Sequence, residues 1–259
     1  MKPKPNTKSL IVELNKPLIL KNIVLDTYIP PKGCLQKYTY IQRIIALSMA
    51  SKFNLAHLLT NFAECVDEEG KIQIANYVHG FEELEEFLKL LGTVFGWFSK
   101  ELLVPLAELR QLWSSEDTHY QDVRSMLQYE VESKLIKPKA SDSDTGTRSL
   151  LRLHRALELI IAFVRGLQNL EMDERCSGVA KKAYKDTLAN FHPWLVQKAA
   201  LLLLNLLPTK AGLIKEICGD DQKKIKSTLK TLPKVVEAMQ NVYQKTEEVY
   251  LEFGLLNLP

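Results

Sequence analysis

The sequence is poor in cysteine and lacks the cysteine spacing of a metal site or a disulfide framework. Its 259 residues include 4 cysteines, at Cys34, Cys65, Cys176 and Cys218. They form no Cys-x-x-Cys pair, and no histidine stands near them at metal-ligand spacing. The pattern argues against a structural zinc site and against a disulfide-stapled fold. It predicts reduced thiols, as in the cytosol.

Long hydrophobic runs are also missing. The most apolar stretches, residues 157–164 and 199–207, fall well short of the roughly 18 to 20 apolar residues that a membrane-spanning helix needs. Near the start of the chain, Glu13, Lys16 and Lys21 interrupt the apolar residues that a secretory signal would require. We therefore expect buried helices, no membrane span and no signal peptide.

The chain has little net charge. It carries 34 Lys and Arg against 31 Asp and Glu, which gives a formal charge of +3 and a sequence pI near 8.5. Nucleic-acid binding would need basic residues concentrated on one face, so this balance does not favour it. A weak attraction to anionic lipid surfaces is still compatible with it.

Catalytic motifs are absent as well. The sequence contains no Gly-x-Ser-x-Gly elbow, no Walker loop, no Gly-x-Gly-x-x-Gly and no His-Glu-x-x-His. No pairing of a nucleophile with a base can be named. We expect a protein that is not an enzyme and that needs no cofactor or metal.

Prolines divide the chain into two parts. They recur through residues 1–52 at a density that prevents long helices, and we interpret this part as an N-terminal extension with short strands at 9–13 and 18–25. From residue 53 to 259, apolar residues return every three or four positions, which predicts a large all-α domain. The expected helices cover residues 53–66, 74–113 with a break near Gly92 or Pro105, 119–136, 148–167, 177–190, 193–206, 209–218 and 225–253.

A row of arginines begins the helix expected at 148–167. Spacings of four and three residues place Arg148, Arg152 and Arg155 on one side of it. Guanidinium groups offer planar, paired donors that match phosphate oxygens. The alternative is a solvated basic face, which the spacing alone favours.

A histidine and a tryptophan flank a proline at a predicted helix start. His192 precedes Pro193, which suits a first helical turn, so the imidazole stands at the entrance of a helix. From there it could donate a hydrogen bond to a ligand; the alternative is an ordinary core or surface histidine. Trp194 fits either the core or a membrane interface.

Seven linked segments stand out along the chain: TRSLLRLHRAL at 147–157, FNL at 53–55, CVD at 65–67, LGTVFGWFSKE at 91–101, FHPWLV at 191–196, LPT at 207–209 and GLLNLP at 254–259. Together, in their order along the chain, they resemble the glycolipid transfer protein superfamily, and within it the branch that transfers ceramide-1-phosphate. The resemblance spans residue 53 to the end.

The resemblance implies a two-layer helical sandwich with an apolar chamber and a polar recognition centre at its mouth. Where glycolipid binders carry a tryptophan, this chain has Arg152, which with Arg148 favours a phosphate headgroup. His192 would hold the ceramide amide or a neighbouring oxygen. The family's recognition aspartate falls on Glu101, one methylene longer, and a family lysine falls on Pro105, which removes a phosphate contact and threatens the local helix.

Together these observations predict a cytosolic, monomeric carrier that moves a sphingolipid of the ceramide-1-phosphate class between membranes. Its contact with a membrane surface would be transient. Two alternatives are a lipid-sensing or interaction adaptor of the same fold with reduced transfer, and a carrier of glycosphingolipids. Fold resemblance alone does not decide among them.

Overall fold

The computed structural model describes residues 53–90, 96–115, 117–136 and 145–258, and it describes no side chains at 96–101. The predicted N-terminal extension, 1–52, and both of its predicted strands lie outside these residues, as does Gly92.

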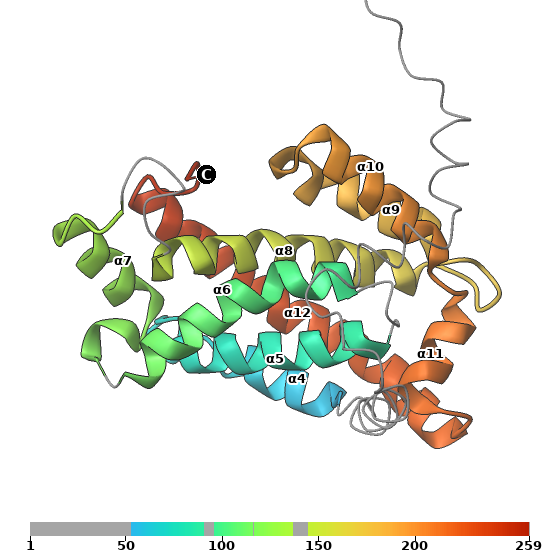
Figure 1. Cartoon of the computed structure of the whole chain (residues 1–259). Helices are drawn as coiled ribbons and strands as arrows, with labels where there is room; N and C mark the ends of the chain where they lie inside the picture. The colour runs from blue at the N-terminus through green and yellow to red at the C-terminus, as the bar shows by residue number, and fades with distance from the viewer. Residues whose placement is uncertain (1–52, 91–95, 116, 137–144, 259) are drawn as a thin grey trace, which may run out of the picture. The chain divides into compact units, whose positions relative to one another are not determined.

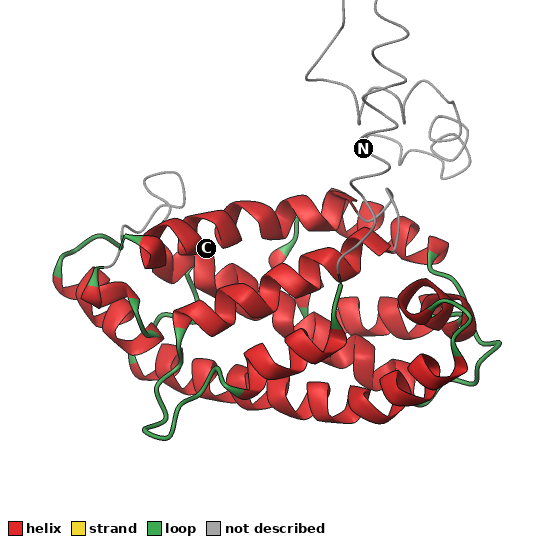
Figure 2. Cartoon of the chain, turned by 90° about the horizontal axis from the view of Figure 1, so that it is seen from below, coloured by secondary structure: helices red, strands yellow, loops and turns green. Residues whose placement is uncertain are grey.

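Every regular element in the described part of the chain is helical, which confirms the all-α prediction (Figure 2). The α-helices are joined by short 3-10 segments, marked η. In chain order the elements are α4 (Leu55–Ala63), α5 (Ile74–Leu90), α6 (Gly96–Ser114), η2 (Thr118–Tyr120), α7 (Val123–Glu132), α8 (Gly146–Gln168), α9 (Ser177–Asp186), η3 (Leu188–Phe191), α10 (Trp194–Leu203), η4 (Leu204–Leu206), α11 (Lys210–Cys218) and α12 (Gln222–Glu252).

Helix α8 runs through the middle of the domain and organises its packing (Figure 1). It contacts α6 on one side and α12 on another, and α6, α5, α4 and α12 pack in succession to complete a ring. Their apolar faces form the main core, to which α8 contributes Leu150, Leu153 and Leu157. A second core joins the last turns of α8 to α9, η4 and α11.

Side-chain caps explain where several helices begin. Asn54 accepts hydrogen bonds from the amides of Ala56 and His57 at the start of α4, and Asp221 accepts from two amides at the start of α12. Thr209 does the same for α11. Each cap satisfies amides that the first helical turn leaves without a partner.

The helix expected at 74–113 is two helices, with α5 ending at Leu90 and α6 beginning at Gly96, so of the two expected break positions Gly92 fits and Pro105 does not. Pro105 does not end α6, which continues to Ser114, because the buried neighbours Leu102, Leu106 and Leu109 hold that face in the core and outweigh one lost backbone bond. The helix expected at 177–190 is instead interrupted at Thr187, whose hydroxyl donates to the carbonyl of Ala183. The chain restarts there as η3.

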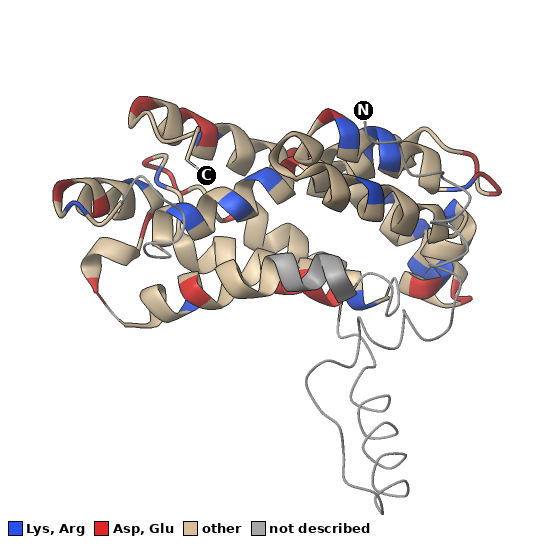
Figure 3. Cartoon of the chain, turned by 45° about the horizontal axis from the view of Figure 1, so that its top comes forward, with Lys and Arg blue, Asp and Glu red and all other residues tan. Residues whose placement is uncertain are grey.

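Basic and acidic residues are distributed along most of the helices (Figure 3). This distribution agrees with the small net charge of the sequence. Within the described residues, no helix is long and apolar enough to cross a membrane.

Candidate functional site

The first turn of α8 is held by a buried carboxylate. Glu130 of α7 accepts hydrogen bonds from the amides of Gly146 (2.8 Å) and Thr147 (2.9 Å). The hydroxyl of Thr145 caps the amide of Arg148. A negative charge at a helix N-terminus is favourable because the amides there carry partial positive charge. These contacts position the helix that bears the arginines.

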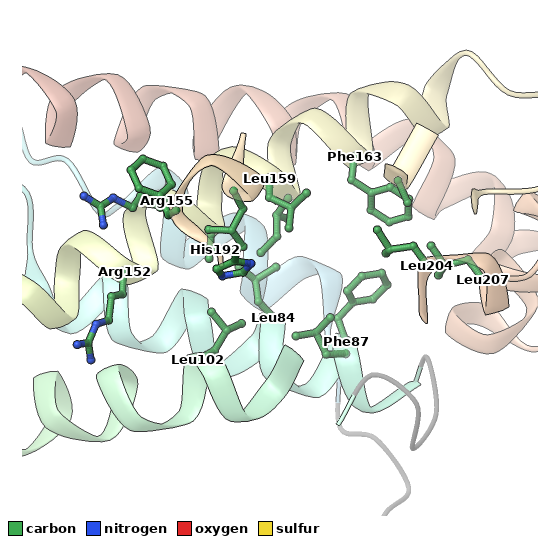
Figure 4. Close-up of a pocket in the computed structure, with 16 residues that line it drawn as sticks. Leu84, Phe87, Leu102, Arg152, Arg155, Leu159, Phe163, His192, Leu204 and Leu207 are labelled. Atoms are coloured by element: carbon green, nitrogen blue, oxygen red, sulfur yellow. The ribbon is translucent and has the colours of Figure 1, made fainter. Parts of the chain in front are cut away.

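A cavity of about 290 Å³ opens beside α8. One end is polar, with the guanidinium groups of Arg152 and Arg155, while Leu204 and Leu207 lie at the other end (Figure 4). His192 lies between the two ends. The remaining lining is apolar and comes from Leu84, Phe87, Leu88, Leu102, Ala156, Leu159, Ile160, Phe163, Ala180, Leu188 and Phe191. The cavity therefore has the polarity of an amphiphile: one cationic end and a long apolar interior.

The C-terminal segment fixes Arg155 at the cationic end of the cavity, which we call the mouth. Its Nη2 donates to the carbonyls of Leu256 (2.9 Å) and Leu258 (2.8 Å). Its guanidinium also lies 3.9 Å from the centre of the Phe191 ring, a cation–π contact. Arg155 thus joins α8, η3 and the end of the chain, and it keeps its positive charge next to Arg152.

His192 is oriented by a tyrosine that sequence reasoning missed. The Tyr184 hydroxyl lies 2.8 Å from Nδ1 of His192. Burial raises the pKa of Tyr184 to about 12, so the phenol keeps its proton and can donate it. When the Tyr184 hydroxyl donates to Nδ1, a neutral His192 carries its proton on Nε2. Gln197 also donates to the carbonyl of His192.

The predicted site residues occupy different depths. Arg152 and His192 line the same cavity although they are far apart in the sequence. Arg148 is only 1% exposed and is not among the residues that line this cavity. Glu101 belongs to α6, but its side chain lies outside the described part of the structure. Roles for these four residues in binding a headgroup remain predictions.

A second apolar cavity of about 240 Å³ adjoins the first. It lies among α4, α5, α8, α11 and α12 and includes Phe53, Val164 and Met239. Leu84, Phe87 and Ile160 line both cavities. These three side chains are therefore the partition between the two apolar spaces.

Large apolar side chains are exposed beside the mouth. We call this surface the apolar patch; it consists of Phe191, Trp194, Leu195, Leu202 and Leu206 on η3, α10 and η4. Phe191 also lines the cavity, so the patch borders its opening. Trp194 is 66% exposed, which decides between its two predicted placements in favour of the surface. Large apolar side chains exposed on three successive elements are typical of an interaction surface.

The sequence matches the model of the glycolipid transfer protein family over residues 72–219. The ceramide-1-phosphate transfer protein of Danio rerio is 34% identical over 215 residues, which are 82% of this chain and 100% of the relative.

Two solved structures are similar to the domain. The apo form of the mouse ceramide-1-phosphate transfer protein is 32% identical, with a TM-score of 0.74 over 80% of this chain and 100% of that one. The human ceramide-1-phosphate transfer protein in complex with 12:0 ceramide-1-phosphate is 29% identical, with a TM-score of 0.72 over the same shares.

These likenesses agree with the arrangement built above from the residues. They confirm the resemblance found in the sequence and the expected two-layer helical sandwich. The helical arrangement is thus that of a known fold. The chain belongs to the glycolipid transfer protein family.

Proposed function

We propose that this protein binds a sphingolipid of the ceramide-1-phosphate class and carries it between membranes without chemical change. The observation that carries the proposal is the cavity with Arg152 and Arg155 at one end, leucines at the other and His192 between them. The names of the relatives and the ceramide-1-phosphate bound in the human structure point to the same ligand class.

In this proposal the headgroup lies at the cationic end. The guanidinium of Arg152 binds phosphate oxygens, since its paired donors match their geometry. Arg155 adds positive charge from its fixed position. With the Tyr184 hydroxyl donating to Nδ1, Nε2 of His192 donates to a carbonyl or hydroxyl oxygen of the ceramide. We retain Arg148 and Glu101 as predicted contributors, Arg148 acting from beneath the mouth.

The alkyl chains of the lipid fill the apolar spaces. Each methylene group removed from water is stabilised by about 0.8 kcal/mol, so release into water is slow and a carrier replaces the solvent. The cavity at the mouth lies near the lower end of the volumes of small-molecule sites, roughly 300–1,000 Å³. We therefore expect the lipid to reach into the second cavity as the ring of Phe87 rotates.

Membrane contact is the next part of the proposal. The apolar patch borders the mouth, so inserting it into a bilayer brings the cavity opening to the lipid. Trp194, with the Lys198 ammonium 5.6 Å from its ring centre, suits an interface where apolar and charged groups meet. We propose a monomeric protein of the cytosol, associated peripherally and transiently with membranes.

A vesicle-to-vesicle transfer assay tests this function, with labelled ceramide-1-phosphate and galactosylceramide compared as cargo. We expect transfer of the phosphate lipid and little transfer of the sugar lipid. Arg152→Leu should lower phosphate-lipid transfer by about tenfold or more, because it removes charge-assisted hydrogen bonds. Arg165→Leu, an exposed change on the same helix, is the matched control.

Other outcomes assign the protein differently. Transfer of the sugar lipid alone would refute the phosphate headgroup. Binding of ceramide-1-phosphate without transfer would favour the lipid-sensing adaptor, for which the proline at position 105 of α6 is the specific observation. Equal losses in the two arginine variants would remove Arg152 from the site.

A further inference from the structure

The N-terminal half of α12 carries a row of lysines that the lipid cavity does not use. Lys223, Lys226, Lys230 and Lys234 are all exposed. Their spacings of three, four and four residues place them on one side of the helix, over roughly 16 Å along its axis. We call this row the lysine stripe. Within the described residues, no ion pair joins any of these four lysines to a carboxylate.

The lysine stripe is unfavourable for the helix that bears it. Like charges four residues apart repel each other, as Lys226, Lys230 and Lys234 do. The stripe also begins in the first turn of α12, where the helix dipole disfavours positive charge. A helix surface whose charges lower the stability of the helix without a compensating contact is expected where that surface has a function.

The stripe lies away from the apolar patch. Helix α12 begins beside α11, at the lower right of Figure 1, whereas α10 lies at the top of that view. Leu229, which is 36% exposed, stands among the lysines and lines the second cavity from the same helix. The stripe is therefore a separate surface of the domain.

We propose that the lysine stripe binds the headgroups of anionic phospholipids at a bilayer surface, as a second and purely electrostatic membrane contact. The choice of a membrane as partner rests on the proposed function. The charge pattern supports it independently, because ammonium groups in one row complement a layer of negative headgroups; the row ends before the exposed Glu237. Lysine suits this role because it attracts phosphate as a point charge and needs no fixed geometry.

The strength expected of such a contact is measurable. Each lysine near an anionic surface strengthens binding by roughly fivefold at physiological salt. Four lysines together give at most two to three orders of magnitude, and added salt weakens the attraction because it screens exposed charges.

The test is cosedimentation of the full chain with vesicles that contain no ceramide-1-phosphate. One set is phosphatidylcholine alone and the other contains phosphatidylserine as well. A variant with all four stripe lysines changed to glutamine is compared with a control of equal charge. The control changes Lys71, Lys182, Lys215 and Lys245 to glutamine, each of which already pairs with a carboxylate.

We expect the stripe variant to bind phosphatidylserine vesicles at least tenfold more weakly, and the control to stay within about twofold of the unchanged protein. Binding to pure phosphatidylcholine should be the same in all three. Equal binding by the stripe variant and the control overturns the proposal. So does stripe-dependent binding to duplex DNA without stripe-dependent binding to vesicles, which would assign the surface to nucleic acid.

The assay is independent of cargo. If the unchanged protein failed to transfer ceramide-1-phosphate but kept stripe-dependent vesicle binding, the proposed function would fail and the lysine stripe would stand. If the protein transferred ceramide-1-phosphate but its vesicle binding did not depend on the stripe lysines, the proposed function would stand and the lysine-stripe proposal would fail.

Discussion

Glu130 supports the site without touching the cavity, and replacing it tests the account of how α8 is positioned. The side chain is 1% exposed and accepts from the amides of Gly146 and Thr147 through separate oxygens. The Tyr120 hydroxyl lies 3.4 Å from one of these oxygens. Glu130→Ala therefore leaves two buried amides without their acceptor at the first turn of α8.

The magnitude follows from those two amides. A buried donor left without a partner costs about 1–3 kcal/mol, so Glu130→Ala should lower the free energy of unfolding by about 2–6 kcal/mol. Glu130→Gln keeps the shape but replaces one acceptor oxygen with a donor, so about half of that loss is expected. These losses are large beside a total stability of about 5–15 kcal/mol.

Urea unfolding followed by circular dichroism measures the effect. Glu132→Ala is the matched control, because this residue is on the same helix but exposed. Its free energy of unfolding should change by no more than about 0.5 kcal/mol. A loss below about 1 kcal/mol in Glu130→Ala would refute the reasoning, since it would mean that water or a nearby group replaces the carboxylate.

Three further predictions concern pH, headgroup and membrane. Burial holds the pKa of His154 below its usual value, and its hydrogen bond to Glu247 lowers the pKa of that carboxyl. As the pH is lowered, the unfolded chain therefore protonates each of these two groups at a higher pH than the folded protein does. Urea unfolding at a series of pH values should show the free energy of unfolding falling below about pH 6.5, through His154, and again below about pH 4.5, through Glu247. His154→Gln should remove the first fall. Pro105 is buried, so urea unfolding first checks that Pro105→Lys remains folded; the folded variant should bind ceramide-1-phosphate about tenfold more tightly, whereas Val104→Lys, on an exposed neighbour, should not. Equal gains would show an effect of net charge alone. Trp194→Ala should weaken cosedimentation with phosphatidylcholine vesicles without lowering the free energy of unfolding, and unchanged binding would contradict the docking role of the apolar patch.

The neutral state of His154 has a structural cause that the pH experiment probes. Its Nε2 lies 2.6 Å from a carboxylate oxygen of Glu247, and its ring stacks on Tyr243 with a centroid distance of 4.3 Å. Its Nδ1 is buried and finds no hydrogen-bond partner among the residues that the structure describes. A second proton would place an unsatisfied N–H donor in the core. If the free energy of unfolding were constant between pH 7 and 5, this assignment would be wrong.

Sequence periodicity predicted most helices because their apolar faces repeat at helical spacing, as at Leu150, Leu153 and Leu157 of α8. It did not predict the interruption at Thr187, where a local side-chain bond to a carbonyl replaces the helical pattern. The sequence also overstated the effect of Pro105 on the helix, because the cost of one proline depends on tertiary packing that a single segment does not reveal. The division of the chain at residue 52 stays a prediction.

At the candidate site, too, the sequence predicted the positions of residues along a helix but not their burial. The spacing of Arg148, Arg152 and Arg155 gives their direction around the helix axis, but it does not give their depth below the surface. Depth depends on which neighbours cover each turn: Arg148 is enclosed near the capped end of α8, Arg152 faces the cavity, and Arg155 is held by carbonyls from the far end of the chain. Three residues of one type in one row therefore have three environments. Arg148 does not line the cavity and Arg155 holds the C-terminal segment, so the replacement of Arg152, which lines the cavity, is the most direct test of phosphate recognition.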